Sequence, residues 1–201
     1  MTNTPKPYPV LLAAGPSSRL GSPKSPTLFR GKNAIEIAIE NCDGLPTPVV
    51  VLGYRAASFA RRVPHAIKIA VNRKWRAGHV GSLLAGLRQI PSHAAFLLYP
   101  VDHIFLGPEV IRRLLRAFEG RKQYQQIFMP RFQGRSGHPV IFCMQIRREL
   151  ELAETARDVV YRNPSRVCHV PVRTPAIWKD FDPRGDSGRS EGAGGSAKSD
   201  A

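Results

Sequence analysis

The chain has 201 residues, with 30 Lys and Arg against 15 Asp and Glu, so its formal net charge at pH 7 is +15. This length fits a single domain. The charge favours a polyanionic partner: nucleotide phosphates, nucleic acid or an acidic membrane surface. The basic residues are scattered without a block of five, which argues against a nucleic-acid-binding tail, and no apolar stretch reaches the roughly 18 residues of a membrane span. We expect neither export nor membrane insertion.

Cysteine usage indicates a reducing compartment. Cys42, Cys143 and Cys168 are odd in number, far apart and without C-x-x-C spacing. Neither a zinc site nor a disulfide framework is indicated, and we expect a cytoplasmic protein.

Apolar runs and helix-like periodicities alternate along the chain. This alternation predicts an α/β fold, a three-layer α/β/α, Rossmann-like single domain with a mostly parallel mixed sheet. After Gln125 the pattern loosens, with strand-like runs, a charged helix and a last strand. The predicted strands are 8–14, 47–53, 67–72, 94–101 and 166–172, and the predicted helices are 33–42, 81–90, 108–118 and 146–163.

The last residues differ in composition from the rest of the chain. Residues 187–201 contain no apolar side chain larger than alanine and cannot offset the entropy of ordering. We therefore predict one folded domain over 1–186 and a disordered tail over 187–201.

Polar loops follow the four predicted parallel strands. They comprise residues 15–24, 53–55, 72–82 and 102–103. In such sheets ligands bind beyond the carboxyl ends of the strands, so these loops should converge on one rim.

The first loop, "AAGPSSRLGSPK", has the chemistry to hold phosphate. Its glycines allow close backbone approach, its amides can form an anion-binding nest, and Arg19 and Lys24 supply charge. It is not a Walker A loop, because no Gly-Lys-Ser/Thr follows, nor is it G-x-G-x-x-G. Taken alone, an ordinary glycine turn is an equal alternative.

Acidic residues are scarce and well placed. Asp102 ends the apolar "YPVDHIFL" run, where an ionised carboxylate needs a partner or a cation such as Mg²⁺. The alternative is a turn or a helix cap before Pro108. "KDFDPRGD" gathers Asp180, Asp182 and Asp186, for which a solvated turn is the alternative.

Two further segments carry polar groups. "NRKWRAGHVGSLLAGL" puts Gly78, Gly81 and Ser82 at a predicted helix start, where amides favour a phosphate or a base edge. An ordinary capped helix is the alternative. "GRSGHP" contains His138, for which a surface or structural role is the favoured interpretation.

The ordered set of these segments resembles the molybdenum cofactor cytidylyltransferase kind of nucleotidyltransferase, within the glycosyltransferase-A-like superfamily. "LAAGPSSRLGSPK" is similar to the family's L-A-A-G-x-S-x-R-M-G-x-x-K, and "VVVLG", "NRKWRAGHVGSLLAGL", "PVDHIFL" and "GRSGHPVIF" match its later motifs over about residues 8–182. The chain departs from the family at Pro16, Pro26 and Ile104. It reads "DFDPRGD" where the family has D-x-D-T-P-E-D.

The resemblance implies roles for individual residues. The backbone around Ala13 would face base and ribose, Arg19 and Lys24 would bind the triphosphate, and Asp102 and Asp182 would hold Mg²⁺. The implied catalytic residues are Arg19, Lys24 and Asp102. The implied nucleotide-binding residues are Leu12, Ala13, Ala14, Gly15, Arg19, Lys24, Gly53, Asn72, Gly78, Gly81, Ser82 and Asp102.

The implied reaction moves a nucleoside monophosphate from a nucleoside triphosphate, expected to be CTP, to a phosphate-bearing acceptor such as the molybdopterin cofactor. The reaction uses Mg²⁺ and releases pyrophosphate. A molybdoenzyme is a candidate partner, and nucleic acid is not an expected one. One alternative is a sugar- or alcohol-phosphate nucleotidyltransferase. The other is a non-catalytic relative that binds nucleotide or nucleic acid, and the altered "DFDPRGD" and the +15 charge favour this second alternative.

Overall fold

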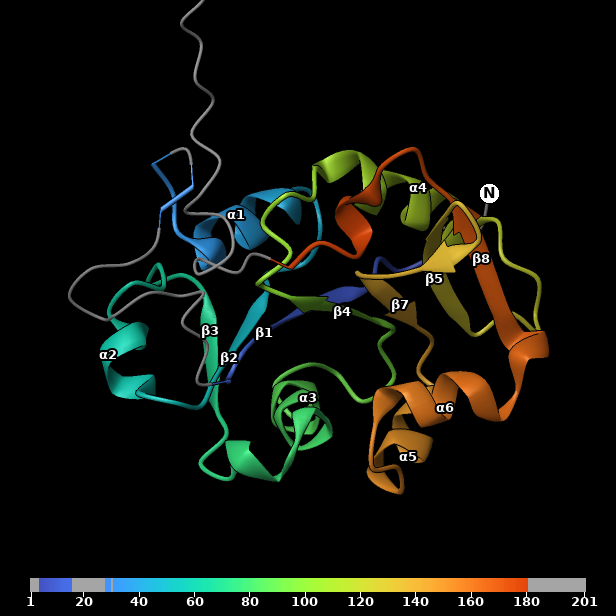
Figure 1. Cartoon of the computed structure of the whole chain (residues 1–201). Coiled ribbons are helices and arrows are strands. Elements are labelled where there is room, and N and C mark those ends of the chain that lie inside the picture. The colour runs from blue at the N-terminus through green and yellow to red at the C-terminus, as the bar shows by residue number, and fades with distance from the viewer. Residues whose placement is uncertain (1–3, 16–27, 30, 181–201) are drawn as a thin grey trace, which may run out of the picture.

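The computed structural model describes residues 4–15, 28–29 and 31–180. Within them, eight strands form one sheet in the order β3-β2-β1-β4-β7-β5-β6, with β8 paired to β5 (Figure 1). The strands are β1 Tyr8–Ala13, β2 Val49–Leu52, β3 Lys68–Val71, β4 Phe96–Pro100, β5 Ile127–Phe132, β6 Arg135–Ser136, β7 Val140–Phe142 and β8 Val167–Pro171.

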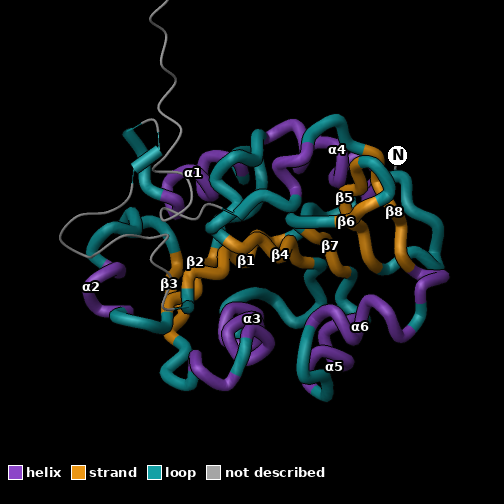
Figure 2. The backbone as a smooth tube through the Cα atoms, in the orientation of Figure 1, coloured by secondary structure: helices purple, strands orange, loops and turns teal. Residues whose placement is uncertain are grey.

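Helices cover both faces of the sheet (Figure 2). The pairs β1–β2, β1–β4, β2–β3 and β5–β8 are parallel, whereas β7 runs antiparallel to β4 and β5. The predicted three-layer, mostly parallel single domain is therefore confirmed. The helices are α1 Ala34–Asn41, α2 Ala56–Ala60, α3 His79–Leu87, α4 Pro108–Glu119, α5 Ile146–Glu151 and α6 Ala156–Arg162, with short 3₁₀ turns η2 Trp75–Ala77, η3 Pro164–Arg166 and η4 Pro175–Ile177.

Two apolar cores lie on the two faces. Alternate strand residues such as Leu11 and Val50 pack against α1 and α4, and the intervening ones such as Val10 and Val51 pack against α3, α5 and α6. Helix α3 lies directly on the sheet because Gly86 has no side chain. A Cβ there would meet the methyl groups of Val10 and Val51 at 2.5 and 2.7 Å.

The charged helix predicted over 146–163 is wrong as a single helix. The chain forms α5 and α6 instead, separated at Thr155. The Thr155 side chain accepts a hydrogen bond from the Asp158 amide and the Asp158 carboxylate accepts one from the Thr155 amide, a reciprocal cap that starts a new helix.

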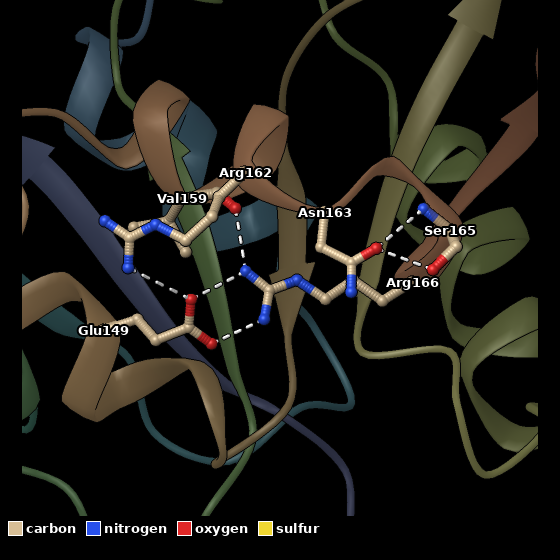
Figure 3. Close-up of polar contacts among 6 residues, drawn as sticks. All are labelled: Glu149, Val159, Arg162, Asn163, Ser165 and Arg166. Carbon is tan, nitrogen blue, oxygen red and sulfur yellow. Dashed lines mark hydrogen bonds and ion pairs between the residues drawn. The ribbon is translucent and has the colours of Figure 1, made fainter.

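An arginine with little solvent exposure ties this region together (Figure 3). Arg166 follows α6 and donates to both carboxylate oxygens of Glu149 on α5 and to the carbonyl of Val159 on α6. Glu149 also pairs with Arg162 at 3.6 Å. The network therefore fixes α5 and α6 relative to the start of β8. No helix within the described ranges is long and apolar enough to cross a membrane.

Candidate active site

The carboxyl ends of β1, β2, β3 and β4 form one edge of the sheet. The Tyr54 amide donates to the Ala14 carbonyl at 3.0 Å, the Asn72 amide to the Leu52 carbonyl at 2.8 Å, and the Val101 amide to the Leu12 carbonyl at 3.1 Å. The parallel pairing thus continues just past the strands. The predicted convergence of the polar loops is confirmed for their described residues.

Gly53 has a packing role at this edge. A Cβ on Gly53 would lie 2.5 Å from the Ala14 carbonyl oxygen and 2.6 Å from the Trp75 Cβ. Only glycine therefore allows the ends of β1 and β2 and the turn after β3 to approach this closely. Its predicted nucleotide contact stays a prediction, but a side chain is excluded on steric grounds alone.

Asn72 and Ser82 are brought together by the fold. Both are buried, and the Asn72 side-chain amide donates to the Ser82 hydroxyl at 3.0 Å, while its oxygen accepts from the Lys74 amide. Gly78, at φ +118°, precedes α3 without a side-chain cap, and a Cβ on Gly81 would lie 3.6 Å from the side-chain nitrogen of Asn72. Asn72 and Ser82 therefore hold the loop between β3 and α3, and their nucleotide contacts stay predictions.

Asp102 follows β4 by two residues. Its side chain is 23% exposed, and one carboxylate oxygen lies 3.9 Å from Nε2 of His103. The residue before α4 is Gly107, with no side-chain cap, so Asp102 does not cap that helix. The helix-cap alternative for Asp102 is therefore wrong, whereas the turn alternative stays, because Asp102 lies in the turn that follows β4.

The loop that carries Asp102 is anchored to α1. The Asn41 side-chain amide donates to the Tyr99 hydroxyl oxygen at 3.0 Å and to the Leu106 carbonyl at 2.8 Å. The Tyr99 hydroxyl in turn donates to the His103 carbonyl at 3.4 Å. Burial raises the pKa of Tyr99, which keeps the phenol a neutral donor. Asn41 on α1 and Tyr99 on β4 thus hold the loop near both of its ends.

Two imidazoles lie side by side next to Asp102. The ring centroids of His103 and His138 are 5.2 Å apart at 51°. Desolvation by burial, assisted by His103, lowers the pKa of His138 to about 4, so this ring is uncharged at neutral pH. Asp180 and His79 also act electrostatically on His138, in opposite directions.

Aromatic and cationic side chains alternate beyond β2 and β3. Tyr54 and Trp75 meet edge to face at 5.6 Å, the Arg55 guanidinium lies 5.4 Å from the Tyr54 ring, and that of Arg76 lies 4.3 Å from the Trp75 ring. This series, here called the cationic ladder, holds two exposed guanidinium groups at the rim.

A metal at this edge would depend on carboxylate oxygens. Within the described part of the chain no three His, Cys, Asp or Glu side chains form a metal cluster. Mg²⁺ needs only one or two carboxylates, with substrate phosphates and water completing its shell, so Asp102 fits such an ion. Arg19, Lys24 and Asp182 lie outside the described residues.

Several residues of this edge were not predicted from the sequence. Asn41 lies on the buried side of α1, and an amide in an apolar stripe is a readable signal of a buried hydrogen bond. Nothing in the sequence distinguishes Tyr99 from other aromatic residues in strands. The partner of His138 is 35 positions away in the sequence, and only the fold reveals that pairing.

Known proteins share this sequence pattern and fold. The chain is 24% identical over 174 residues to a probable molybdenum cofactor guanylyltransferase from Geobacillus sp. (strain WCH70), which covers 85% of this chain and 88% of that protein. Its fold is similar to the crystal structure of Rv0371c from Mycobacterium tuberculosis H37Rv, with a TM-score of 0.69, 23% identity, and coverage of 85% of this chain and 91% of that one. The manganese complex of Rv0371c matches with a TM-score of 0.66, 21% identity, and coverage of 83% and 88%. The model of the MobA-like NTP transferase domain matches residues 9–167, and the chain belongs to this family of nucleotidyltransferases.

Proposed function

We propose that this nucleotidyltransferase moves a nucleoside monophosphate from CTP to the phosphate of a molybdopterin-type acceptor and releases pyrophosphate. The observation that carries the proposal is the shared edge of β1 to β4, where the ends of four parallel strands lie side by side. The glycine-rich loop begins at this edge after β1, and Asp102 lies there after β4.

The proposed roles follow from this arrangement. Backbone groups of Leu12, Ala13, Ala14 and Gly15 bind the nucleoside, and Arg19 and Lys24 bind the triphosphate. The loop that Asn72 and Ser82 hold contacts the base through Gly78 and Gly81. Negative charge builds up on the phosphoryl oxygens in the transition state, so positioned cations account for the rate without a protein nucleophile.

We propose Mg²⁺ as the metal, held by Asp102 and Asp182. A bound divalent cation neutralises phosphate charge and orients the α-phosphate for in-line attack by the acceptor oxygen. The related structure that was solved as a manganese complex supports a divalent cation in this fold. Asp102, fixed at the end of β4 by the Asn41 network, supplies a hard oxygen ligand at a defined position.

GTP is the second candidate donor, because the curated relative is named a guanylyltransferase. The resemblance of the opening loop to cytidylyltransferases favours CTP. A molybdoenzyme that receives the product stays the proposed partner. We propose a cytoplasmic location, which agrees with Cys42, Cys143 and Cys168 being free thiols.

The test is pyrophosphate release by the full chain with each of CTP, GTP, ATP and UTP, with and without Mg²⁺ and the molybdopterin cofactor. We expect release only when all three components are present, with the highest kcat/KM for CTP. A thermal-shift series checks binding separately, since a ligand at 100 times its Kd stabilises by about 2.7 kcal/mol. A higher kcat/KM for GTP than for CTP would make GTP the donor. No pyrophosphate release with any of the four triphosphates would overturn the proposal.

A further inference from the structure

Three segments that are far apart in the sequence meet where β7 begins, beside the end of β4. The turn before β7 carries His138, the loop after β4 carries His103, and the residues after η4 include Asp180. His79, at the start of α3, is also close enough to act electrostatically on His138. The proposed mechanism gives none of these four side chains a role.

The backbone holds His138 firmly in this place. Its amide donates to the Ile177 carbonyl at 2.9 Å, and the amide of Gly137 donates to the Pro130 carbonyl at 3.1 Å. A Cβ on Gly137 would lie 2.1 Å from the Ile177 carbonyl oxygen. The turn therefore packs directly against η4, and its position is set before any ligand arrives.

The His138 side chain contributes little to holding the fold. Among the described residues, its buried Nδ1 has no hydrogen-bond partner. A buried polar atom without a partner destabilises a protein, so a structural role would be served better by an apolar ring. An unpartnered imidazole in a rigid setting beside the proposed metal ligand is instead what a ligand-binding residue requires.

The geometry of transfer places the acceptor on this side. In-line displacement requires the attacking oxygen to lie opposite the leaving pyrophosphate. The proposed nucleotide loops follow β1, β2 and β3, and β4 separates them from β7. An acceptor that reaches the α-phosphate beside Asp102 therefore approaches past β7, where His138 and His103 lie.

We propose that His138, backed by His103, contacts the heterocyclic ring of the acceptor and so selects a ring-bearing acceptor over a simple phosphate monoester. This inference rests on the proposed function. An uncharged imidazole has no charge with which to bind phosphate, but it offers one hydrogen-bond donor, one acceptor and a flat face to a heterocycle.

The test varies the acceptor at saturating nucleoside triphosphate, for the wild-type chain and for His138→Phe, His138→Gln and His93→Phe. The acceptors are the molybdopterin cofactor and, as a comparison without the ring, glycerol 3-phosphate. His93 is exposed and precedes β4, at the opposite edge of the sheet, so it is the matched control.

For His138→Phe we expect the KM for the molybdopterin cofactor to rise about tenfold, the loss expected for one hydrogen bond. The KM for the triphosphate should stay within about twofold, and the preference over glycerol 3-phosphate should shrink by the same factor. His138→Gln, which can still hydrogen bond, should retain part of the preference. The Tm of His138→Phe should not fall, because no hydrogen bond of Nδ1 is lost.

The outcomes separate the two proposals. Pyrophosphate release by wild type together with an unchanged acceptor KM in folded His138→Phe overturns the role of His138 alone. A lower Tm with parallel losses for both substrates shows a structural role and also overturns it. No transfer by wild type with either acceptor overturns the proposed function, and this inference with it.

Discussion

The side-chain amide of Asn41 lies 3.0 Å from the hydroxyl oxygen of Tyr99, and both groups are buried. Asn41 ends α1, and Tyr99 precedes the last residue of β4. Through this contact the helix on one face of the sheet reaches the loop that carries Asp102. Asn41 is therefore a positioning residue, and its effect on transfer should be measurable apart from its effect on stability.

Replacing Asn41 with Ala removes two buried hydrogen bonds. We expect the free energy of unfolding to fall by about 1–3 kcal/mol, because the Leu106 carbonyl and the Tyr99 hydroxyl lose a partner. We also expect kcat to fall with little change in the triphosphate KM, because the Asp102 loop loses its anchor. Urea denaturation and pyrophosphate release measure the two effects. Asn163→Ala is the control, since the hydrogen bonds of its side chain are local ones from Ser165. A normal kcat in Asn41→Ala would limit Asn41 to a role in folding.

Replacing Asp102 with Ala should abolish transfer while the fold survives, because its carboxylate is one of the two proposed ligands of the cation. EDTA should abolish pyrophosphate release in the wild-type chain, and added Mg²⁺ or Mn²⁺ should restore it. The exposed Asp43→Ala is the matched control. Near wild-type turnover by purified Asp102→Ala would overturn the metal assignment.

The strand-end loops show what sequence can predict. The four apolar runs at 8–14, 47–53, 67–72 and 94–101 are confirmed as β1 to β4, each one to three residues shorter, because the predicted runs extend past the paired positions. Their parallel pairing follows from helices lying between them. The proximity of Gly53 and Asp102 to one edge could thus be read from the order of elements.

Other features depend on contacts that no local pattern encodes. The split of residues 146–163 into α5 and α6 depends on the Thr155–Asp158 cap, which the longer helical periodicity obscured. The proximity of His103 to His138 depends on β7 running antiparallel beside β4. Arg19, Lys24, Asp182 and the tail over 187–201 remain predictions, because they lie outside the described residues.

Replacing Gly53 with Ala tests the close approach at the nucleotide edge. The new methyl group would meet the Ala14 carbonyl oxygen and the Trp75 Cβ, neither of which can move without shifting the backbone. We expect a loss of about 1–3 kcal/mol in unfolding free energy and a higher triphosphate KM. Gly120→Ala, where the nearest atom would lie at an ordinary 3.6 Å, is the control for both measurements. A stability equal to wild type would show that the three segments are not in close contact.

The Glu149–Arg166 pair predicts a pH dependence of stability. The hydrogen bond from Arg166 lowers the pKa of Glu149 below its unfolded value. The stabilisation is therefore complete above the ordinary Glu pKa of about 4.5 and is lost as the pH falls through the lower folded value. At pH 7 Glu149→Gln should be about 2 kcal/mol less stable, because Arg166 is left with weakened partners at low solvent exposure.

Urea titrations of wild type and Glu149→Gln between pH 7 and pH 3 measure this dependence. The two stabilities should converge at the acid end, where Glu149 of the wild-type chain is protonated. Glu109→Gln is the control: its pairs with Arg112 and Arg113 are exposed and should contribute little at any pH. A constant difference across the range would contradict the assignment of the pH dependence to Glu149.

The positive charge is concentrated in one part of the fold. Between Asp43 and Asp102 the sequence contains no Asp or Glu but has eight basic residues: Arg55, Arg61, Arg62, Lys68, Arg73, Lys74, Arg76 and Arg88. This stretch therefore supplies +8 of the net charge of +15. It forms the end of the sheet at β3, together with α2 and α3. The cationic ladder puts two of these charges at the rim.

Such a field should speed the capture of a polyanionic triphosphate and should be screened by salt. We expect the kcat/KM for the triphosphate to fall roughly tenfold between 50 and 300 mM NaCl, with kcat nearly constant. Replacing Arg55 and Arg76 with Gln should lower the value at 50 mM and flatten the salt dependence. Arg88→Gln removes one charge of the same stretch, but Arg88 follows α3 at the opposite edge of the sheet, so its salt dependence should match wild type. Equal slopes for all three proteins would show that the ladder has no part in capture. The net charge would then act only through the residues that touch the triphosphate.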